Sequence, residues 1–165
     1  MEASNTLDNV LLLAPVVVIK PGFRGRVQII ARDTVDIQQD SELLYPSAVC
    51  GYSHSQATHV LLGPNSRVNG VVIAAQGAGN SLPCVVHMAS GAAVQGQVFS
   101  AGSVENCGAV RGTVMCQRLV YRTATTFFDN YLVNALIDRS ALPNAFLTTA
   151  LLNPGASTGT IAWVR

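Results

Sequence analysis

The unit Val68-Asn69-Gly70-Val71-Val72 recurs twice further along the chain, as Val94-Gln95-Gly96-Gln97-Val98 and as Val110-Arg111-Gly112-Thr113-Val114. Each copy follows a short stretch of small or polar residues and leads into another apolar run. Such recurrence is typical of stacked strand-and-turn units, in which every repeat buries its apolar face against its neighbours. The repeat therefore predicts an architecture, and it leaves the activity open.

The glycines of these units are predicted to lie at corners, where a strand bends onto the next face. Glycine tolerates positive φ and leaves room for the neighbouring repeat. The predicted corner residues are Gly25, Gly70, Gly96 and Gly112. A set of antiparallel hairpins with one glycine each is the alternative, and the repetition favours the stack.

Composition agrees with a stack of narrow layers. The chain has 165 residues, of which 49% are apolar, 12% are charged and only 6% are aromatic. Its core must then consist mainly of Val, Leu, Ile and Ala, which suits stacked strands. We expect one mainly β domain over residues 1–165, a single-stranded parallel β-helix with a helical cap. Its expected parts are a flexible N-terminus (1–9), stacked strands (10–124), a helix (125–140) and a C-terminal edge segment (141–165).

The predicted helix rests on a change of periodicity after Tyr121. Thr126-Phe127-Phe128-Asp129 resembles a capping box, and apolar residues follow at positions 127, 128, 131, 132, 135 and 136. This spacing places them on one face of a helix that ends near Ile137. We expect the helix to cover an edge of the stacked strands. The tail, residues 160–164, is expected to add a last edge strand.

Charge and hydropathy exclude two classes of partner. The net charge is +1, and the ten basic residues are scattered, so the chain lacks the concentrated positive field that nucleic acids require. No apolar run is long enough to span a bilayer. The first residues, Met1-Glu2-Ala3-Ser4-Asn5, do not form a secretory signal. The expectation is either a cytoplasmic protein or a domain whose export signal or anchor lies upstream.

No catalytic residue, metal ligand or cofactor site is predicted, and the binding residues stay unknown. His54, His59 and His87 do not have the order of gaps found in γ-class carbonic anhydrases, which are β-helices with zinc bound between rungs. Asp33, Asp36, Asp40 and Glu42 could form a calcium site, but a solvated turn is favoured. The chain contains neither a Gly-x-Ser-x-Gly elbow nor a phosphate-binding loop.

The four cysteines, Cys50, Cys84, Cys107 and Cys116, lack a C-x-x-C pair. Buried free thiols are favoured over a bridge such as Cys107 to Cys116.

Several short motifs resemble those of the bactofilin-type, polymer-forming β-helix proteins. They are the three valine-glycine units, Gly25-Arg26-Val27-Gln28-Ile29, Leu44-Tyr45-Pro46-Ser47, Phe128-Asp129-Asn130-Tyr131-Leu132 and Ile137-Asp138-Arg139. The chain is also similar to bacterial envelope proteins in which a prepilin-like anchor precedes such a domain. The resemblance implies a right-handed solenoid and a place in the cell envelope, and it supplies no catalytic residues.

Two functions follow as hypotheses. The first is a non-enzymatic structural or interaction module of the bacterial cell envelope, whose partners are further copies of itself or other envelope proteins. The alternative is a carbohydrate-binding protein or a metal-dependent β-helical enzyme, with sugars stacked on Tyr45, Tyr52, Tyr121 or Tyr131. The expected compartment is the envelope, reached through an upstream anchor, with the cytoplasm as the alternative.

Overall fold

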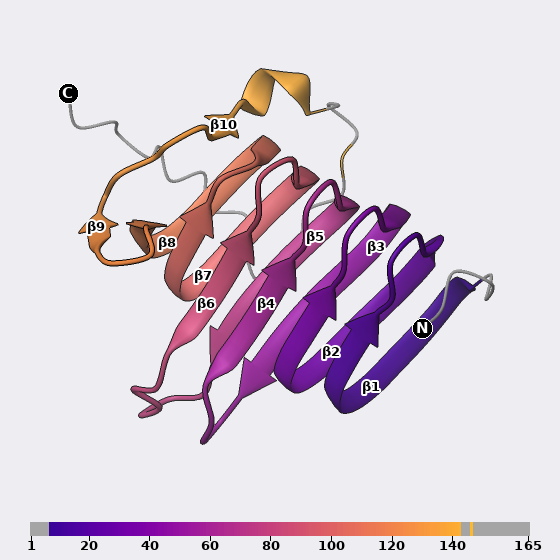
Figure 1. Cartoon of the computed structure of the whole chain (residues 1–165). Helices are drawn as coiled ribbons and strands as arrows, with labels where there is room; N and C mark the ends of the chain where they lie inside the picture. The colour runs from indigo at the N-terminus through magenta and orange to yellow at the C-terminus, as the bar shows by residue number, and fades with distance from the viewer. Residues whose placement is uncertain (1–6, 143–145, 147–165) are drawn as a thin grey trace, which may run out of the picture.

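The computed structural model describes residues 7–142 and Phe146, and this part of the chain consists mainly of β-strands (Figure 1). The strands are β1 (Asp8–Ile19), β2 (Arg24–Ile37), β3 (Glu42–Ser53), β4 (Thr58–Leu62), β5 (Arg67–Gln76), β6 (Cys84–Met88), β7 (Ala93–Asn106), β8 (Ala109–Arg122), β9 (Phe127–Asp129) and β10 (Leu136–Ile137). One 3-10 turn, η1 (Arg139–Ala141), follows them. The prediction of a mainly β fold is confirmed. None of the described helical segments has the length and apolarity of a membrane span.

Strands β1 to β8 pair in parallel. The order β7-β5-β3-β2-β4-β6 closes on itself because β6 also pairs with β7, so six strands form a closed parallel ring. The remaining strands extend this ring: β1 pairs with β2, β8 and then β10 continue beyond β7, and β9 pairs with β8. Figure 1 shows β1 at one end of the resulting stack and β8 to β10 at the other.

The strands stack in two rows, which form two faces, and β1, β2, β7 and β8 each contribute one half to each face. In β2, residues 24–31 pair with β3, whereas residues 34–37 pair with β4. The first face comprises residues 8–14, 24–31, 42–53, 67–76, 93–100 and 109–116. The second face comprises residues 16–19, 34–37, 58–62, 84–88, 103–106 and 118–120.

The core consists of in-register columns of β-branched side chains. On the first face Ile29, Val49, Val72 and Val98 form one column, and on the second face Val35, Val60, Val86 and Val104 form another; all eight have 0% exposure. Every second residue of β4 and β6 is buried, as expected for strands with one face in the core. Burial of each such side chain contributes about 1.5–3 kcal/mol.

Three of the predicted corner glycines form a column of their own within the strands. Gly70, Gly96 and Gly112 are in register across β5, β7 and β8, with φ of 154°, 146° and 154°. A Cβ at Gly70, Gly96 or Gly112 would overlap the carbonyl oxygen of Ser47, Gly70 or Gly96, respectively. Glycine is therefore required here for both its conformation and its size. Gly25 lies in β2 without positive φ, and a Cβ there would come within 2.9 Å of the Phe23 ring.

A second column marks the tight turns that lead from the second face back to the first. Gly22, Asp40, Asn65 and Gly91 all have left-handed backbone, with φ between 56° and 78°. Asn65 lies against two of the other members, because its Nδ2 donates to Asp40 Oδ1 at 3.2 Å and a Cβ on Gly91 would meet Asn65. The sequence repeat missed this column because three different residue types occupy one conformation.

The predicted helix over residues 125–140 is wrong. Phe127–Asp129 is a strand, β9, that pairs antiparallel with the end of β8. Thr126, the expected helix cap, instead closes the hairpin turn, since its N–H donates to Thr123 Oγ1 at 3.0 Å. Asn130 and Asn134 have φ of 56° and 52°, a left-handed conformation that interrupts a right-handed helix.

The other predicted boundaries fall partly outside the described residues. Parallel strands run from Asp8 to Arg122, so Asp8 and Asn9 of the expected flexible terminus belong to β1. Residues 1–6 lie outside the described part of the chain. So does almost all of the expected edge segment 141–165, including the predicted strand at 160–164.

Candidate functional site

The two ends of the stack expose core columns that neighbouring strands cover elsewhere. One column runs through every level of the first face and includes Leu12, Ile29, Val49, Val72, Val98 and Val114. Its four inner members are fully buried, whereas Leu12 and Val114 are partly exposed while packing against the core. The stack thus ends in apolar side chains that a further strand could cover.

At the first end, β1 pairs with β2 and with no other described strand. Its side chains Leu11, Leu13 and Val16 are exposed, Leu13 to 73%. An apolar edge strand is a template for pairing with another chain. The described residues place no charged side chain between positions 9 and 19 of β1 to oppose such pairing.

At the other end, β8 is covered only in part by described strands. β10 pairs with Ala109 and Val110, and β9 pairs with residues 120–122. Between these two pairings, residues 111–118 have β7 as their one described strand neighbour. Residues 111–116 of this stretch lie on the first face, as do residues 8–14 of β1.

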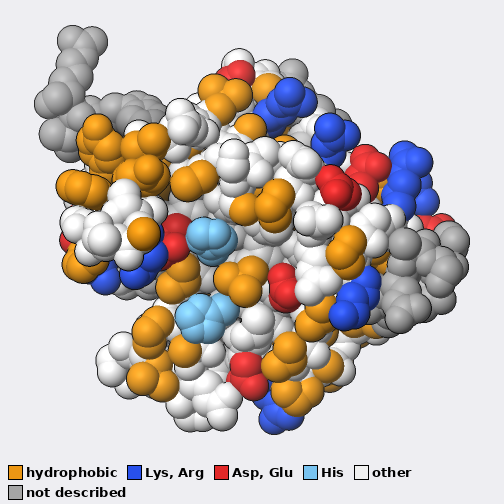
Figure 2. Space-filling model, viewed as in Figure 1, with side chains coloured by type: hydrophobic (Ala, Val, Ile, Leu, Met, Phe, Trp, Pro, Cys, Tyr) orange, Lys and Arg blue, Asp and Glu red, His pale blue; other side chains and the backbone are white. Residues whose placement is uncertain are grey.

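An aromatic cluster lies beside this second end. The ring centroids of Tyr121, Phe128 and Tyr131 are 6.0 to 6.4 Å apart, and Phe128 and Tyr131 are about half exposed. Figure 2 shows hydrophobic side chains gathered in this part of the molecule, where Figure 1 places β8 and β9. Exposed aromatic clusters of this kind mark interaction surfaces.

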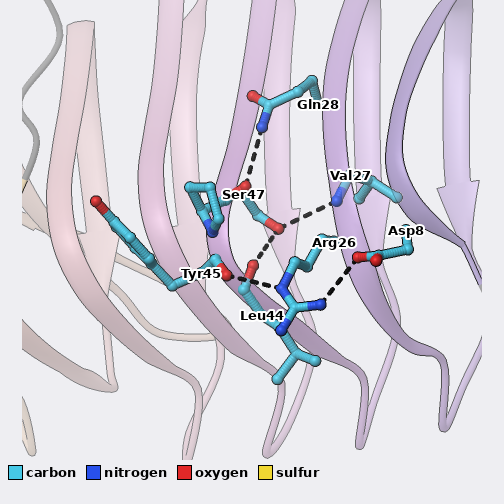
Figure 3. Close-up of polar contacts among 8 residues, drawn as sticks. Asp8, Arg26, Val27, Gln28, Leu44, Tyr45 and Ser47 are labelled. Carbon is cyan, nitrogen blue, oxygen red and sulfur yellow. Dashed lines mark hydrogen bonds and ion pairs between the residues drawn. The ribbon is translucent and has the colours of Figure 1, made fainter.

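A bulge in β3 ties the first three strands together (Figure 3). Leu44, Tyr45 and Pro46 form the bulge, between the positions of β3 that pair with β5. Ser47 Oγ donates to Leu44 O at 2.6 Å and accepts from Val27 N at 3.2 Å. The guanidinium of Arg26 donates to Tyr45 O at 3.0 Å and to Asp8 Oδ1 at 2.9 Å. The bond from Arg26 to Asp8 links β2 to β1, and the bonds to Tyr45 and from Val27 fix the bulge of β3 on β2.

The second face carries a small polar network. His87 Nδ1 lies 3.0 Å from Glu105 Oε2, and Arg122 donates to Glu105 Oε1 from its Nε at 3.0 Å. Glu105 is nearly buried, so the pairing compensates the burial of its charge. Figure 2 shows histidine side chains in the middle of this face, which β4 and β6 form. The network contains no serine, threonine or cysteine nucleophile.

The structure does not bring the three histidines together. His54 lies in the loop after β3 and contacts Tyr52. His59 lies on β4, and His87 lies on β6, where it contacts Glu105 of β7. Within residues 7–142 no group of three or more His, Cys, Asp or Glu side chains could hold a metal ion.

The acidic residues are dispersed as well, and each of the four has its own partner. Glu42 pairs with Arg24 at 3.0 Å, Asp40 accepts from Asn65, and Asp36 accepts from Gln38 Nε2 at 3.1 Å. Asp33 accepts from the side-chain amide of Gln56 in the amide orientation that satisfies both groups. They do not form a calcium site.

All four cysteines are free thiols. Burial raises the pKa of the Cys50, Cys84 and Cys116 thiols above the ordinary value of 9.0. Such thiols are poor nucleophiles, because the thiolate is the reactive form.

The four tyrosines proposed as sugar platforms lie in three places. Tyr45 packs on Phe146 at 5.5 Å between ring centroids, Tyr52 packs on His54 at 5.0 Å, and Tyr121 and Tyr131 belong to the aromatic cluster.

Sequence reasoning missed the partly exposed ends of the core columns. A signal was present, because residues 10–14 form a continuous apolar run, Val-Leu-Leu-Leu-Ala, of the kind that strands of a stack need.

Comparison of the chain with protein-family models, with curated proteins and with solved structures finds no match in any of the three.

Proposed function

We propose that this chain is a non-enzymatic structural module that self-associates end to end, with β1 of one copy stacking on β8 of the next. The observation that carries the proposal is the core column that ends in Leu12 at one end and in Val114 at the other. A second copy placed in line would continue this column, because both ends present the same kind of side chain at the same register position. Parallel strand addition would also satisfy backbone groups of β8 between residues 111 and 118, where β7 is the one described strand neighbour.

The proposal includes a finer description of the fold, a single-stranded β-helix. Each pass of the chain adds one segment to the first face and one to the second, and both segments pair in parallel with the preceding pass. The closed ring of six strands is compatible with this winding, because the long strands β2 and β7 belong to both faces. The right-handedness of the winding stays a prediction.

The head-to-tail mode follows from the difference between the two ends. Two β1 ends related by a twofold axis would meet in antiparallel orientation, and the columns would not continue in register. A β1 end on a β8 end keeps the parallel pairing that β1 to β8 use throughout. Because the copies are stacked in line, this heterologous contact does not close into a ring, and repeated addition produces a filament.

The bacterial cell envelope is the proposed compartment. The support is the resemblance to bactofilin-type and anchored envelope proteins, in which a polymer-forming domain is held at the membrane. Fractionation of cells that produce the full natural reading frame would test it, and recovery of the protein in the soluble cytoplasmic fraction alone would contradict it.

Self-association is tested by light scattering coupled to size exclusion and by negative-stain microscopy over a wide concentration range. We expect oligomers that lengthen with concentration. Leu13→Lys should abolish them, because it places a charge on the exposed edge of β1. Leu82→Lys is the matched control, since Leu82 is also exposed but lies in the loop between β5 and β6. A monomer at every concentration, or equal loss in both variants, would overturn the proposal.

A further inference from the structure

A pocket of about 510 Å³ lies at the corner where the first face passes into the second. Three successive levels of the stack contribute to it: Pro15 from β1, Arg32 and Asp33 from β2, and residues 52–56 from β3 and the loop before β4. We call it the corner pocket. Its volume lies within the range of small-molecule sites, roughly 300–1,000 Å³.

Hydrogen bonds within the described structure hold the loop of the corner pocket in place. Ser53 Oγ accepts from the backbone N–H groups of Ser55 and Gln56 at 3.4 and 3.0 Å. From the following loop, Asn80 Nδ2 donates to the carbonyl oxygens of Ser53 and Gln56 at 3.2 and 2.9 Å. The pocket is therefore formed before any ligand arrives, which reduces the entropic cost of binding.

The two charged side chains of the corner pocket, Arg32 and Asp33, differ in their partners. In the orientation that satisfies both groups, the Gln56 amide donates to the two carboxylate oxygens of Asp33, at 2.5 and 3.2 Å. Arg32 forms no ion pair with a described residue, although four other arginines of the described chain do. A guanidinium with open donors in a preformed pocket favours a carboxylate, which it can bind through two parallel hydrogen bonds.

An aromatic ring completes the pocket. Tyr52 is 37% exposed, and its ring meets the His54 ring edge to face at 5.0 Å between centroids. The contact between Tyr52 Oη and His54 Nε2, at 3.3 Å, fixes both side chains. A fixed aromatic ring offers an apolar surface to the C–H face of a sugar, and the neighbouring Ser55 and His54 offer donors and acceptors to its hydroxyl groups.

We propose that the corner pocket binds a carboxylated sugar ring, a uronic acid, with its carboxylate on Arg32 and its ring on Tyr52. Pro15 is its one residue from the end strand β1, and its ligand groups lie on the side of the stack, so the site goes beyond self-association and would let an assembled module hold an acidic polysaccharide along its side. A second hollow of about 500 Å³, which contains Arg67 and Arg111, lacks an aromatic ring and provides a control.

Titration calorimetry of the full chain with glucuronate tests the proposal, with glucose as the uncharged probe. We expect a dissociation constant of about 1 mM or tighter for glucuronate, and weaker binding of glucose. Arg32→Gln should weaken glucuronate about tenfold and leave glucose unchanged, because it removes a charge-assisted hydrogen bond. Tyr52→Ala should weaken both sugars.

The controls are Arg67→Gln and Tyr131→Ala, which alter an exposed arginine and an exposed tyrosine outside the corner pocket. Both should bind glucuronate as the natural chain does. Should Tyr52→Ala fail to fold, Tyr52→Phe keeps the ring and must retain binding of glucuronate within about threefold. No heat with glucuronate, equal affinity for glucose, or equal weakening by Arg67→Gln would each overturn the assignment.

Discussion

Val98 and Leu12 occupy the same column of the first face, yet their environments differ. Val98 lies between two neighbouring strands and is fully buried, whereas Leu12 belongs to the terminal strand and is partly exposed. One side-chain pattern thus has two environments. In the interior the pattern stabilises the fold, and at the ends it forms the surface that we propose binds a further strand.

The largest expected effect is on stability, and it distinguishes a glycine within the stacked strands from a glycine in a loop. Gly96→Ala should lower the free energy of unfolding by about 3 kcal/mol or more, because its Cβ would overlap Gly70 O and its φ is 146°. The matched control is Gly79→Ala, where φ is also positive, at 81°, but nothing lies within 4 Å of the added Cβ. We expect a loss of only about 1 kcal/mol there.

Urea unfolding followed by circular dichroism measures both variants. Equal losses in Gly96→Ala and Gly79→Ala would mean that conformation alone, and not the close stacking of backbones, requires the glycine column.

The next effect compares Val98 and Leu12 directly. Val98→Ala should cost about 2 kcal/mol, because it leaves a cavity in a packed interior. Leu12→Ala removes a larger side chain but should cost only about 1 kcal/mol, because Leu12 is partly exposed. The two substitutions should affect self-association in the opposite order: Leu12→Ala should weaken it, and Val98→Ala should leave it unchanged in protein that is still folded.

Urea unfolding measures the stability of both variants, and light scattering on the same samples measures their self-association. A larger stability loss in Leu12→Ala than in Val98→Ala would contradict the assignment of β1 as an exposed end.

The sequence predicts the interior better than the ends for a physical reason. The apolar alternation and the glycines at 70, 96 and 112 recur because each level must fit the level beside it. The segment after Tyr121 does not lie between two described levels of the stack. Its apolar spacing fits a helix as well as a hairpin. The left-handed residues Asn130 and Asn134 decide the outcome, and nothing in the apolar pattern shows them.

The candidate sites, like the fold, could be predicted from the sequence only in part. The repeated units predicted the stack whose ends form the proposed contact, but they did not predict which side chains of the ends stay exposed. The corner pocket could not be predicted, because Pro15, Arg32 and Tyr52 meet only when three levels of the stack align. The stacked turns at Gly22, Asp40, Asn65 and Gly91 were also missed, although each is a residue type that favours tight turns.

The smallest effect concerns the thiols of the interior. Burial raises the pKa of the Cys84 and Cys50 thiols in the folded chain, so the unfolded chain loses these protons first as the pH rises. The stability that these groups contribute is therefore complete below pH 9.0, the ordinary thiol pKa, and is lost as the pH rises through the folded-state pKa. Urea midpoints measured at neutral and at alkaline pH should show this decline. Cys84→Ala should show a smaller decline than the natural chain, because its strongly buried thiol is absent. An identical decline in both would mean that other groups cause it, and that the interior around Cys84 does not disfavour the thiolate.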